Sequence, residues 1–173
     1  MIGYVGAGPA EDTNDPELHY AFFEYGQVLN SEGLQFTLLG NASWGDPGTT
    51  ALRALSFETE GVNISAELSY PFIRSRSENL TGTIAFDYKD SHSISLGNTA
   101  SEDRLRIIRG ELSYDFADDG GGINQLIGSV SAGIEGLGST SNGNPNASRT
   151  PGRVDFFKTT VKASRRQNLP KQF

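Results

Sequence analysis

The sequence contains no cysteine, only two histidines, and no run of about 18 apolar residues. The missing apolar run excludes a transmembrane helix. The absence of cysteine suits an envelope protein and a cytosolic protein equally. Basic residues are also scarce, since 14 Lys and Arg stand against 21 Asp and Glu. The resulting net charge of −7 argues against a nucleic-acid-binding protein, which needs a basic surface.

Familiar site motifs are missing as well. His19 and His92 are far apart and have no partner motif, which gives no support to a metal or catalytic role. The glycine cluster at residues 3–8 lacks the strand–loop–helix context of a nucleotide-binding loop. The aspartates at residues 115–119 lack the ligand spacing of a calcium loop, so we interpret them as part of a turn. We therefore predict no catalytic residue, no metal, no cofactor and no enzymatic activity.

What the sequence does have is alternation of apolar and polar residues along most of its length. Between Val62 and Phe72, for example, every second residue is apolar. Successive side chains of a strand leave it on opposite faces, so this pattern predicts strands with one apolar and one polar face. The predicted strands are 18–29, 34–44, 62–72, 79–88, 107–116, 125–134 and 154–165. Residues 1–17 are too polar and broken for a strand, and we predict an irregular segment there.

The connections between these strands alternate in length. The short ones are 30–33, 74–78 and 117–122, and the long ones are 45–60, 89–104 and 135–153. Short turns at one end and long loops at the other are typical of antiparallel outer-membrane β-barrels. Aromatic residues near the strand ends agree with this, because aromatic girdles mark both membrane interfaces of such barrels. The residues concerned are Trp44, Tyr70, Phe72, Tyr88, Tyr114 and Phe116.

A soluble β-sandwich that acts as a binding module would also alternate, with its apolar residues facing a core. Two features favour the membrane barrel. The predicted strands run to about ten residues, longer than the usual five or six. Their polar faces are rich in Ser, Thr and Asn with charges of both signs, which suits a water-filled lumen. A small self-contained barrel, acting as a porin or adhesin, would need an eighth strand from residues 1–17.

One stretch carries a more specific pattern, LSYPFIRSRSENL at residues 68–80. It resembles the signature of the haemolysin secretion/activation family, the outer-membrane transporters of two-partner secretion. Residues 102–118, 121–139 and 147–170 resemble the family's following strands, in the same order. The positions of the turn that match the family motif are Tyr70, Pro71, Arg74, Ser75, Arg76, Asn79 and Leu80.

The resemblance implies a protein-translocating pore in the outer membrane of a Gram-negative bacterium. Such transporters place two periplasmic domains before a sixteen-stranded barrel and export a large haemolysin- or adhesin-type protein by the type V, two-partner route. The expected fold is all-β, an antiparallel meander of about seven long strands within that barrel. Residues 18–173 would form an internal fragment, without the periplasmic domains or the last barrel strands. Its partners would be the secreted protein in transit, outer-membrane lipid and the rest of the transporter, and no nucleic acid.

The polar faces of the predicted strands carry the charged side chains that would line the lumen. They are Glu67, Asp87, Arg109, Glu111, Asp115, Lys158 and Lys162. These side chains would form a polar track for an unfolded polypeptide, or pair with each other across neighbouring strands. Arg74 and Arg76 would lie in a periplasmic turn. They could make a docking contact there or simply be solvated, and we favour the solvated turn.

Overall fold

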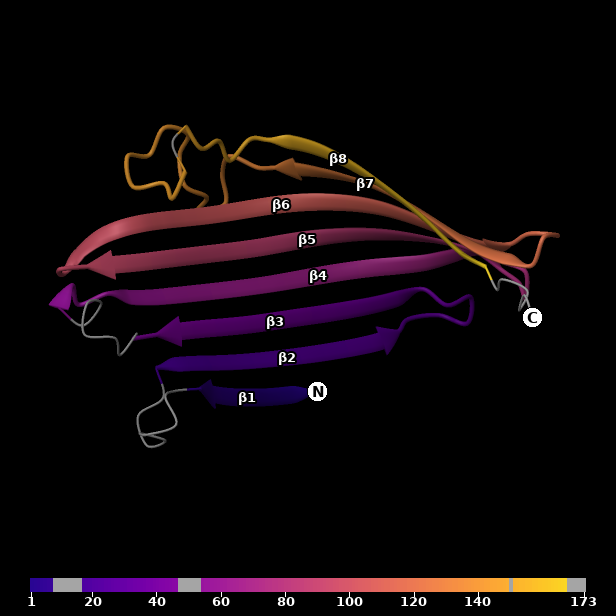
Figure 1. The fold of residues 1–173 in the computed structure, drawn as a ribbon, viewed down its shortest axis with the longest axis horizontal. Helices are drawn as coiled ribbons and strands as arrows, with labels where there is room; N and C mark the ends of the chain where they lie inside the picture. The colour runs from indigo at the N-terminus through magenta and orange to yellow at the C-terminus, as the bar shows by residue number, and fades with distance from the viewer. Residues whose placement is uncertain (8–16, 47–53, 150, 168–173) are drawn as a thin grey trace, which may run out of the picture.

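The computed structural model of the chain describes residues 1–7, 17–46, 54–149 and 151–167. Its strands are β1 (Ile2–Ala7), β2 (Leu18–Val28), β3 (Gln35–Gly45), β4 (Glu58–Arg74), β5 (Glu78–Ser95), β6 (Asn98–Ala117), β7 (Gly122–Gly133) and β8 (Phe157–Gln167). They form one antiparallel sheet in which each strand pairs with the next along the chain (Figure 1). The all-β meander predicted from the alternation is confirmed, with one strand more than expected. No helix in the described part is long and apolar enough to cross a membrane.

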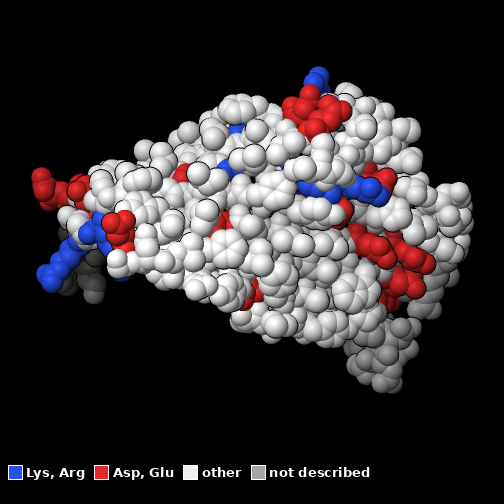
Figure 2. Space-filling model, turned by 180° about the vertical axis from the view of Figure 1, so that it is seen from behind, with Lys and Arg blue, Asp and Glu red and all other residues white. Residues whose placement is uncertain are grey.

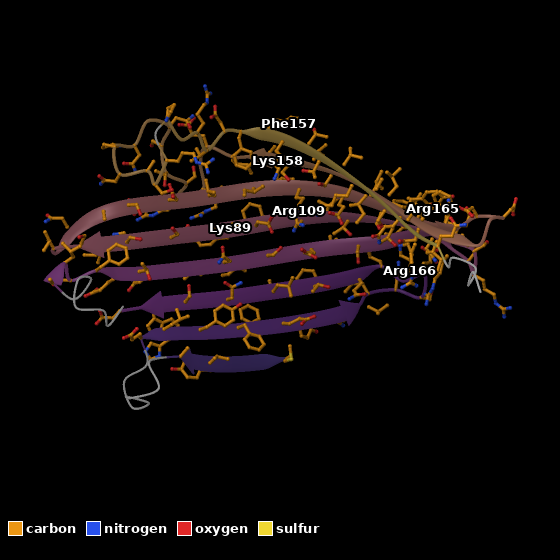
Figure 3. All side chains as sticks on the ribbon, viewed as in Figure 1. Lys89, Arg109, Phe157, Lys158, Arg165 and Arg166 are labelled. Atoms are coloured by element: carbon orange, nitrogen blue, oxygen red, sulfur yellow. The ribbon has the colours of Figure 1, made fainter. Side chains whose placement is uncertain are left out.

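The register of the strands gives the sheet two chemically different faces. Phe36 on β3 pairs with Leu68 on β4, and Leu68 pairs with Ile84 on β5. Their neighbours Thr37 and Glu67 pair with each other on the opposite face. Paired residues of antiparallel strands project to the same side, so an apolar face and a polar face extend across the sheet. Figure 2 looks onto the apolar face and Figure 3 onto the polar face.

The sheet has almost no core. Among the described residues, Ala85, Ile107 and Val154 are the only buried apolar side chains. Large apolar side chains stay exposed in the middle of the apolar face, where Ile84 keeps 67% of its surface accessible. Burial of apolar surface is the main driving force of folding, at about 25 cal/mol per Å². We conclude that the apolar face needs cover from outside the sheet.

The hairpin of β5 and β6 corrects one prediction. Residues 89–104 are predicted to form a long loop, but both strands continue to a two-residue turn at Leu96 and Gly97. Both turn residues have positive φ, 52° and 72°, as in a type I′ hairpin turn. The prediction was wrong because this stretch is almost entirely polar, so no apolar stripe indicates the strands. The hairpin therefore extends well past the apolar part of the sheet.

The N-terminal segment corrects a second prediction. Residues 1–17 are predicted to be irregular, yet Ile2–Ala7 form β1 and pair with β2. Gly3 makes room for this pairing, because a Cβ there would lie 2.3 Å from the ring of Phe22. Residues 8–16 lie outside the described part. Eight strands would suit a small closed barrel, but β1 and β8 do not pair in the described chain and the sheet stays open (Figure 1).

The connection between β7 and β8 folds back onto β6, in agreement with the long loop predicted at 135–153. The amide of Ile134 donates to the carbonyl of Arg106 at 2.8 Å, and the amide of Thr140 donates to the carbonyl of Arg104 at 3.0 Å. The amide of Arg104 in turn donates to Oγ1 of Thr140 at 2.7 Å. The loop thereby satisfies backbone groups on the part of β6 that β7 does not reach (Figure 1).

Candidate functional site

The polar face carries a cluster of charges on β4, β5 and β6. The guanidinium of Arg109, which is labelled in Figure 3, lies 3.0 Å from Oε1 of Glu67 and 3.4 Å from Oδ1 of Asp87. Ser65 donates its hydroxyl to the same oxygen of Asp87 at 2.6 Å. Asp87 is buried, with 8% of its surface exposed. Arg109 therefore holds together two carboxylates that would repel each other without a cation.

The other charged positions predicted for the lumen lie on the same face in separate groups. Glu111, Lys158 and Lys162 line a hollow of about 260 Å³ across β6, β7 and β8, and Arg109 of the cluster borders the same hollow. Asp115 accepts a hydrogen bond of 2.9 Å from the side chain of Gln125. The register places all seven predicted positions on one face. It brings three of them into a single cluster and leaves the remaining four outside it.

The apolar face carries a belt of aromatic rings near the short turns. Tyr70 and Phe72 form an edge-to-face pair with ring centroids 5.2 Å apart at the end of β4. Tyr114 and Phe116 form a stacked pair with centroids 5.0 Å apart at the end of β6. A β-bulge at Pro71–Ile73 shifts the register of β4 at this level. We call these four aromatic residues the turn belt.

The two tyrosines of the turn belt direct their hydroxyl groups to carboxylates in or next to the short turns. Tyr70 donates to Glu32 at 3.2 Å, and Tyr114 donates to Glu78 at 2.9 Å. Such a tyrosine keeps its ring on an apolar surface and its hydroxyl in a polar one. This arrangement is typical of a boundary between apolar and aqueous surroundings.

A second belt, the loop belt, crosses the same face at its other end and consists of Tyr4, His19, Trp44 and Tyr88. The hydroxyl of Tyr4 is hydrogen-bonded to Nδ1 of His19 at 2.5 Å, and the His19 ring stacks on Trp44 with centroids 5.5 Å apart. Trp44 and Tyr88 are aromatic residues that the sequence places near strand ends. Tyr4 and His19 were missed, because their strand register is visible only in the folded sheet.

Between the two belts the apolar face forms a band with little charge. On β6, Arg106 pairs with Tyr88 of the loop belt and stands eight residues before Tyr114 of the turn belt. At about 3.4 Å per residue, the belts are roughly 27 Å apart along this strand. Figure 2 shows the larger groups of Lys, Arg, Asp and Glu at one end and over the other half of this face, with only small charged patches between them. An apolar groove of about 710 Å³, bounded in part by Leu68 and Val161, lies within the band.

From the level of the loop belt outward, the same face becomes charged. Arg106 is only 3% exposed; it donates to Oδ1 of Asp90 at 2.6 Å and to the carbonyl of Leu137 at 3.1 Å. Arg104 pairs with Glu102 at 2.5 Å nearby. The hairpin of β5 and β6 and the β7–β8 loop thus form one polar projection, which Arg106 joins together. The only sign of Arg106 in the sequence is a charged residue within an otherwise apolar row.

The turn between β4 and β5 contains the positions that match the family motif. The hydroxyl of Ser75 donates to the carbonyl of Glu78 at 2.9 Å and accepts from the Glu78 amide at 2.9 Å. Arg74, the last residue of β4, pairs with Asn79 at the start of β5. Arg74 and Arg76 are exposed, and neither forms an ion pair within the described residues. This geometry agrees with a solvated turn.

The turn between β6 and β7 is built around Asp118. Its carboxylate accepts hydrogen bonds from the amides of Gly120 and Gly122 at 3.0 and 3.1 Å and from the Asn124 side chain at 2.8 Å. It also pairs with Arg165 on β8. The Asn124 side chain first, and then the Gly122 amide and Arg165, lower the pKa of Asp118 to about 2. The described part of the chain contains no group of three or more His, Cys, Asp or Glu that could hold a metal.

No family model, no curated protein and no solved structure matches this chain. The resemblance to two-partner secretion transporters therefore stays a prediction from the residues themselves. The features of the chain that bear on function are the two faces of the sheet, the two aromatic belts and the polar projection.

Proposed function

We propose that this chain is part of the wall of an outer-membrane β-barrel that secretes a large haemolysin- or adhesin-type protein by the two-partner route. The observation that carries the proposal is the band of the apolar face that the two aromatic belts enclose. Membrane barrels present such a band, about 25 Å tall, to lipid between aromatic girdles. Lipid would supply the cover that the apolar face lacks.

In this proposal the polar face lines the lumen. The cluster of Arg109, Glu67 and Asp87 suits that position, because lumen-facing residues of membrane barrels are polar and reach water. The short turns would face the periplasm and the long connections would face outside. The projection that contains Asp90 and Arg106 would then stand at the outer boundary of the hydrocarbon, where protein groups and not lipid bury Arg106.

Passage along such a wall requires no catalytic residue. An unfolded partner protein would move along the polar face, where Ser and Thr side chains and paired charges offer hydrogen bonds without a closed pocket. No nucleotide is available at the outer membrane, so folding of the exported protein outside would supply most of the driving force. Lipid does not tolerate open sheet edges, so further strands would close the pore beyond β1 and β8.

A general porin or adhesin barrel is the second candidate, because it would present the same two faces to lipid and water. The run LSYPFIRSRSENL at residues 68–80 favours the secretion transporter over it. A soluble β-sandwich is less favoured. A sandwich needs two packed sheets, whereas the described strands form a single sheet.

The single tryptophan gives a direct test of the membrane face. Trp44 belongs to the loop belt and is exposed on the apolar face. The chain would be refolded into vesicles whose lipids carry bromine either near the headgroup or deep in the acyl chain. We expect bromine to quench Trp44 fluorescence, and more strongly from the shallow position, because aromatic belts lie at the membrane interface.

A matched control moves the indole to the other face. Ser43 precedes Trp44 on β3 and projects to the polar face. The variant Trp44→Phe/Ser43→Trp should escape quenching by both lipids, because its indole would face water. Absence of quenching of Trp44 in folded protein that floats with the vesicles in a density gradient would rule out the membrane face.

A second measurement separates secretion from a general pore. Cells with and without the gene for this chain would be compared by mass spectrometry of the culture medium. A two-partner transporter predicts the loss of one large extracellular protein from cells that lack the gene. A porin predicts slower uptake of small solutes and an unchanged set of secreted proteins, and that outcome would favour the second candidate.

A further inference from the structure

Strand β8 forms one edge of the sheet. It spans Phe157–Gln167, and its inner side pairs with β7 over its whole length. Its outer side has no partner strand in the part of the chain that the structure describes. An unpaired edge of this length presents N–H and C=O groups that can receive another strand.

The β8 edge has opposite chemical character on its two faces. Lys158, Lys162 and Arg166 follow each other at intervals of four residues, so all three project to the polar face. Phe157 and Val161 project to the apolar face, and Phe157 keeps 74% of its surface exposed. β8 contains no acidic residue, although the whole chain has a net charge of −7. Figure 3 shows Lys158 near one end of β8 and Arg166 near the other.

The acidic residues of the polar face leave this basic row unneutralised. Glu111 shares the hollow with Lys158 and Lys162, but forms an ion pair with neither of them in the described structure. Asp115 lies two strands away from β8 and is hydrogen-bonded to Gln125. The row therefore carries unpaired positive charge along a free strand edge.

We propose that the β8 edge receives an extended polypeptide strand with carboxylates on its polar-face side and apolar side chains on its other side. Carboxylates opposite Lys158, Lys162 and Arg166 would form cross-strand ion pairs. Apolar side chains of the same strand would cover Phe157 and Val161. The inference goes beyond the proposed function, because a pore wall does not specify which strand adjoins β8.

A second copy of this sheet does not supply such a strand from its opposite edge. That edge is β1, Ile2–Ala7, which contains no acidic residue. The positive charge of β8 therefore favours a strand unlike β1, one that is amphipathic and acidic. Lysine on a strand edge can also serve to prevent pairing, and the experiment must distinguish this role from binding.

Two synthetic peptides test the proposal on the full chain in detergent micelles. Both alternate apolar residues with charged ones, and the charged positions are Glu in the first peptide and Lys in the second. Fluorescence anisotropy of the labelled peptides should show roughly tenfold tighter binding of the Glu peptide, with a smaller difference at high salt. The variant Lys158→Glu/Lys162→Glu/Arg166→Glu should reverse this preference.

Lys89→Glu provides the matched control, because Lys89 lies on the polar face of β5, away from the edge (Figure 3). It should leave the preference unchanged. A Glu peptide with methylated backbone nitrogens should lose binding, since it cannot complete a strand ladder. Binding of neither peptide, or equal binding of both, overturns the proposal and favours edge protection. Failure of the chain to enter vesicles, with peptide preference intact, would count against the membrane proposal alone.

Discussion

The guanidinium of Arg106 lies 3.5 Å from the ring centroid of Tyr88 on the neighbouring strand. The same guanidinium donates to Asp90 on β5 and to the carbonyls of Leu137 and Gly138 in the β7–β8 loop. One buried side chain therefore connects the long hairpin to the loop. It does so at the level of the loop belt, where the apolar band ends.

Replacement of Arg106 should loosen this whole projection. Arg106→Met keeps much of the side-chain volume but removes the charge and the donors to the loop. We expect the free energy of unfolding to fall by about 3 kcal/mol, because Asp90 loses its largely buried partner. Urea unfolding followed by Trp44 fluorescence measures the loss, and hydrogen exchange at the Thr140 amide reports release of the loop.

Arg104→Met is the control for that experiment. The Arg104–Glu102 pair is much more exposed, so its loss should cost less than about 1 kcal/mol and leave exchange in the loop unchanged. Equal losses in the two variants would show that Arg106 has no special role in joining the hairpin to the loop.

The stability of the central cluster on the polar face should depend on Arg109, its one cation. Arg109→Met leaves Glu67 facing Asp87 without a positive charge between them, and we expect a loss of about 2 kcal/mol. The triple variant Arg109→Met/Glu67→Gln/Asp87→Asn removes the repulsion and should recover most of this stability. Thermal unfolding of both variants in one detergent provides the comparison. A triple variant as unstable as the single one would contradict an electrostatic cause.

The contribution of the turn around Asp118 to the stability of the fold should decrease in acid. The pKa of Asp118 is lowered to about 2, below its ordinary value of 3.8, because Asn124, the Gly122 amide and Arg165 favour the charged form. A carboxyl with a lower pKa in the folded state stabilises the fold above pH 3.8, and this contribution is lost as the pH falls through 2. NMR titration of the Asp118 carboxyl carbon should give a midpoint near 2.

Asn124→Ala removes the largest cause of that shift, so the pKa of Asp118 should rise toward its ordinary value. Arg165→Met should raise the pKa of Asp118 as well, because it removes both a hydrogen bond and a positive charge that favour the carboxylate. An Asp118 carboxyl that already titrates near 3.8 in the unaltered chain would show that the hydrogen-bonded turn does not form in solution.

Two glycines of the apolar face should respond differently to alanine. A Cβ at Gly40 would lie 2.1 Å from the ring of Phe23, which covers this glycine from the paired position on β2. Gly40→Ala should displace the ring and cost about 1–2 kcal/mol. A Cβ at Gly128 would have no atom within 4 Å. Gly128→Ala should therefore leave the free energy of unfolding unchanged or raise it slightly, because alanine loses less backbone entropy on folding. Urea unfolding of both variants shows which of them is the less stable.

Alternation in the sequence located strands wherever one face is apolar. Residues 62–72 were predicted as a strand and lie within β4, and residues 107–116 lie within β6. The outer halves of β5 and β6 were missed because they pair through the turn at Leu96 and Gly97 without an apolar stripe. β1 was missed because it is short and because Gly3 is covered by the ring of Phe22 from the neighbouring strand, a contact that the sequence does not reveal.

The sequence predicts which face of the sheet carries the candidate site, but it does not predict which side chains contact each other there. Alternation alone puts Glu67, Asp87 and Arg109 on the polar side of their strands. Which of these side chains meet is decided by the register, and a shift of two residues would keep the face but change every pair. Arg106 could not be foreseen in this way, because its partners at Leu137 and Gly138 come from a loop without periodicity.

The scarcity of buried apolar side chains changes what the thermodynamics of this chain describe. With Ala85, Ile107 and Val154 as the only buried ones in the described residues, most of the favourable transfer of apolar surface must involve the surroundings. In the proposed membrane setting, a melting temperature measured on this chain would characterise the detergent or bilayer together with the polypeptide. In that setting, a change of acyl-chain length would act on its stability as an amino-acid substitution does in the interior of a water-soluble protein.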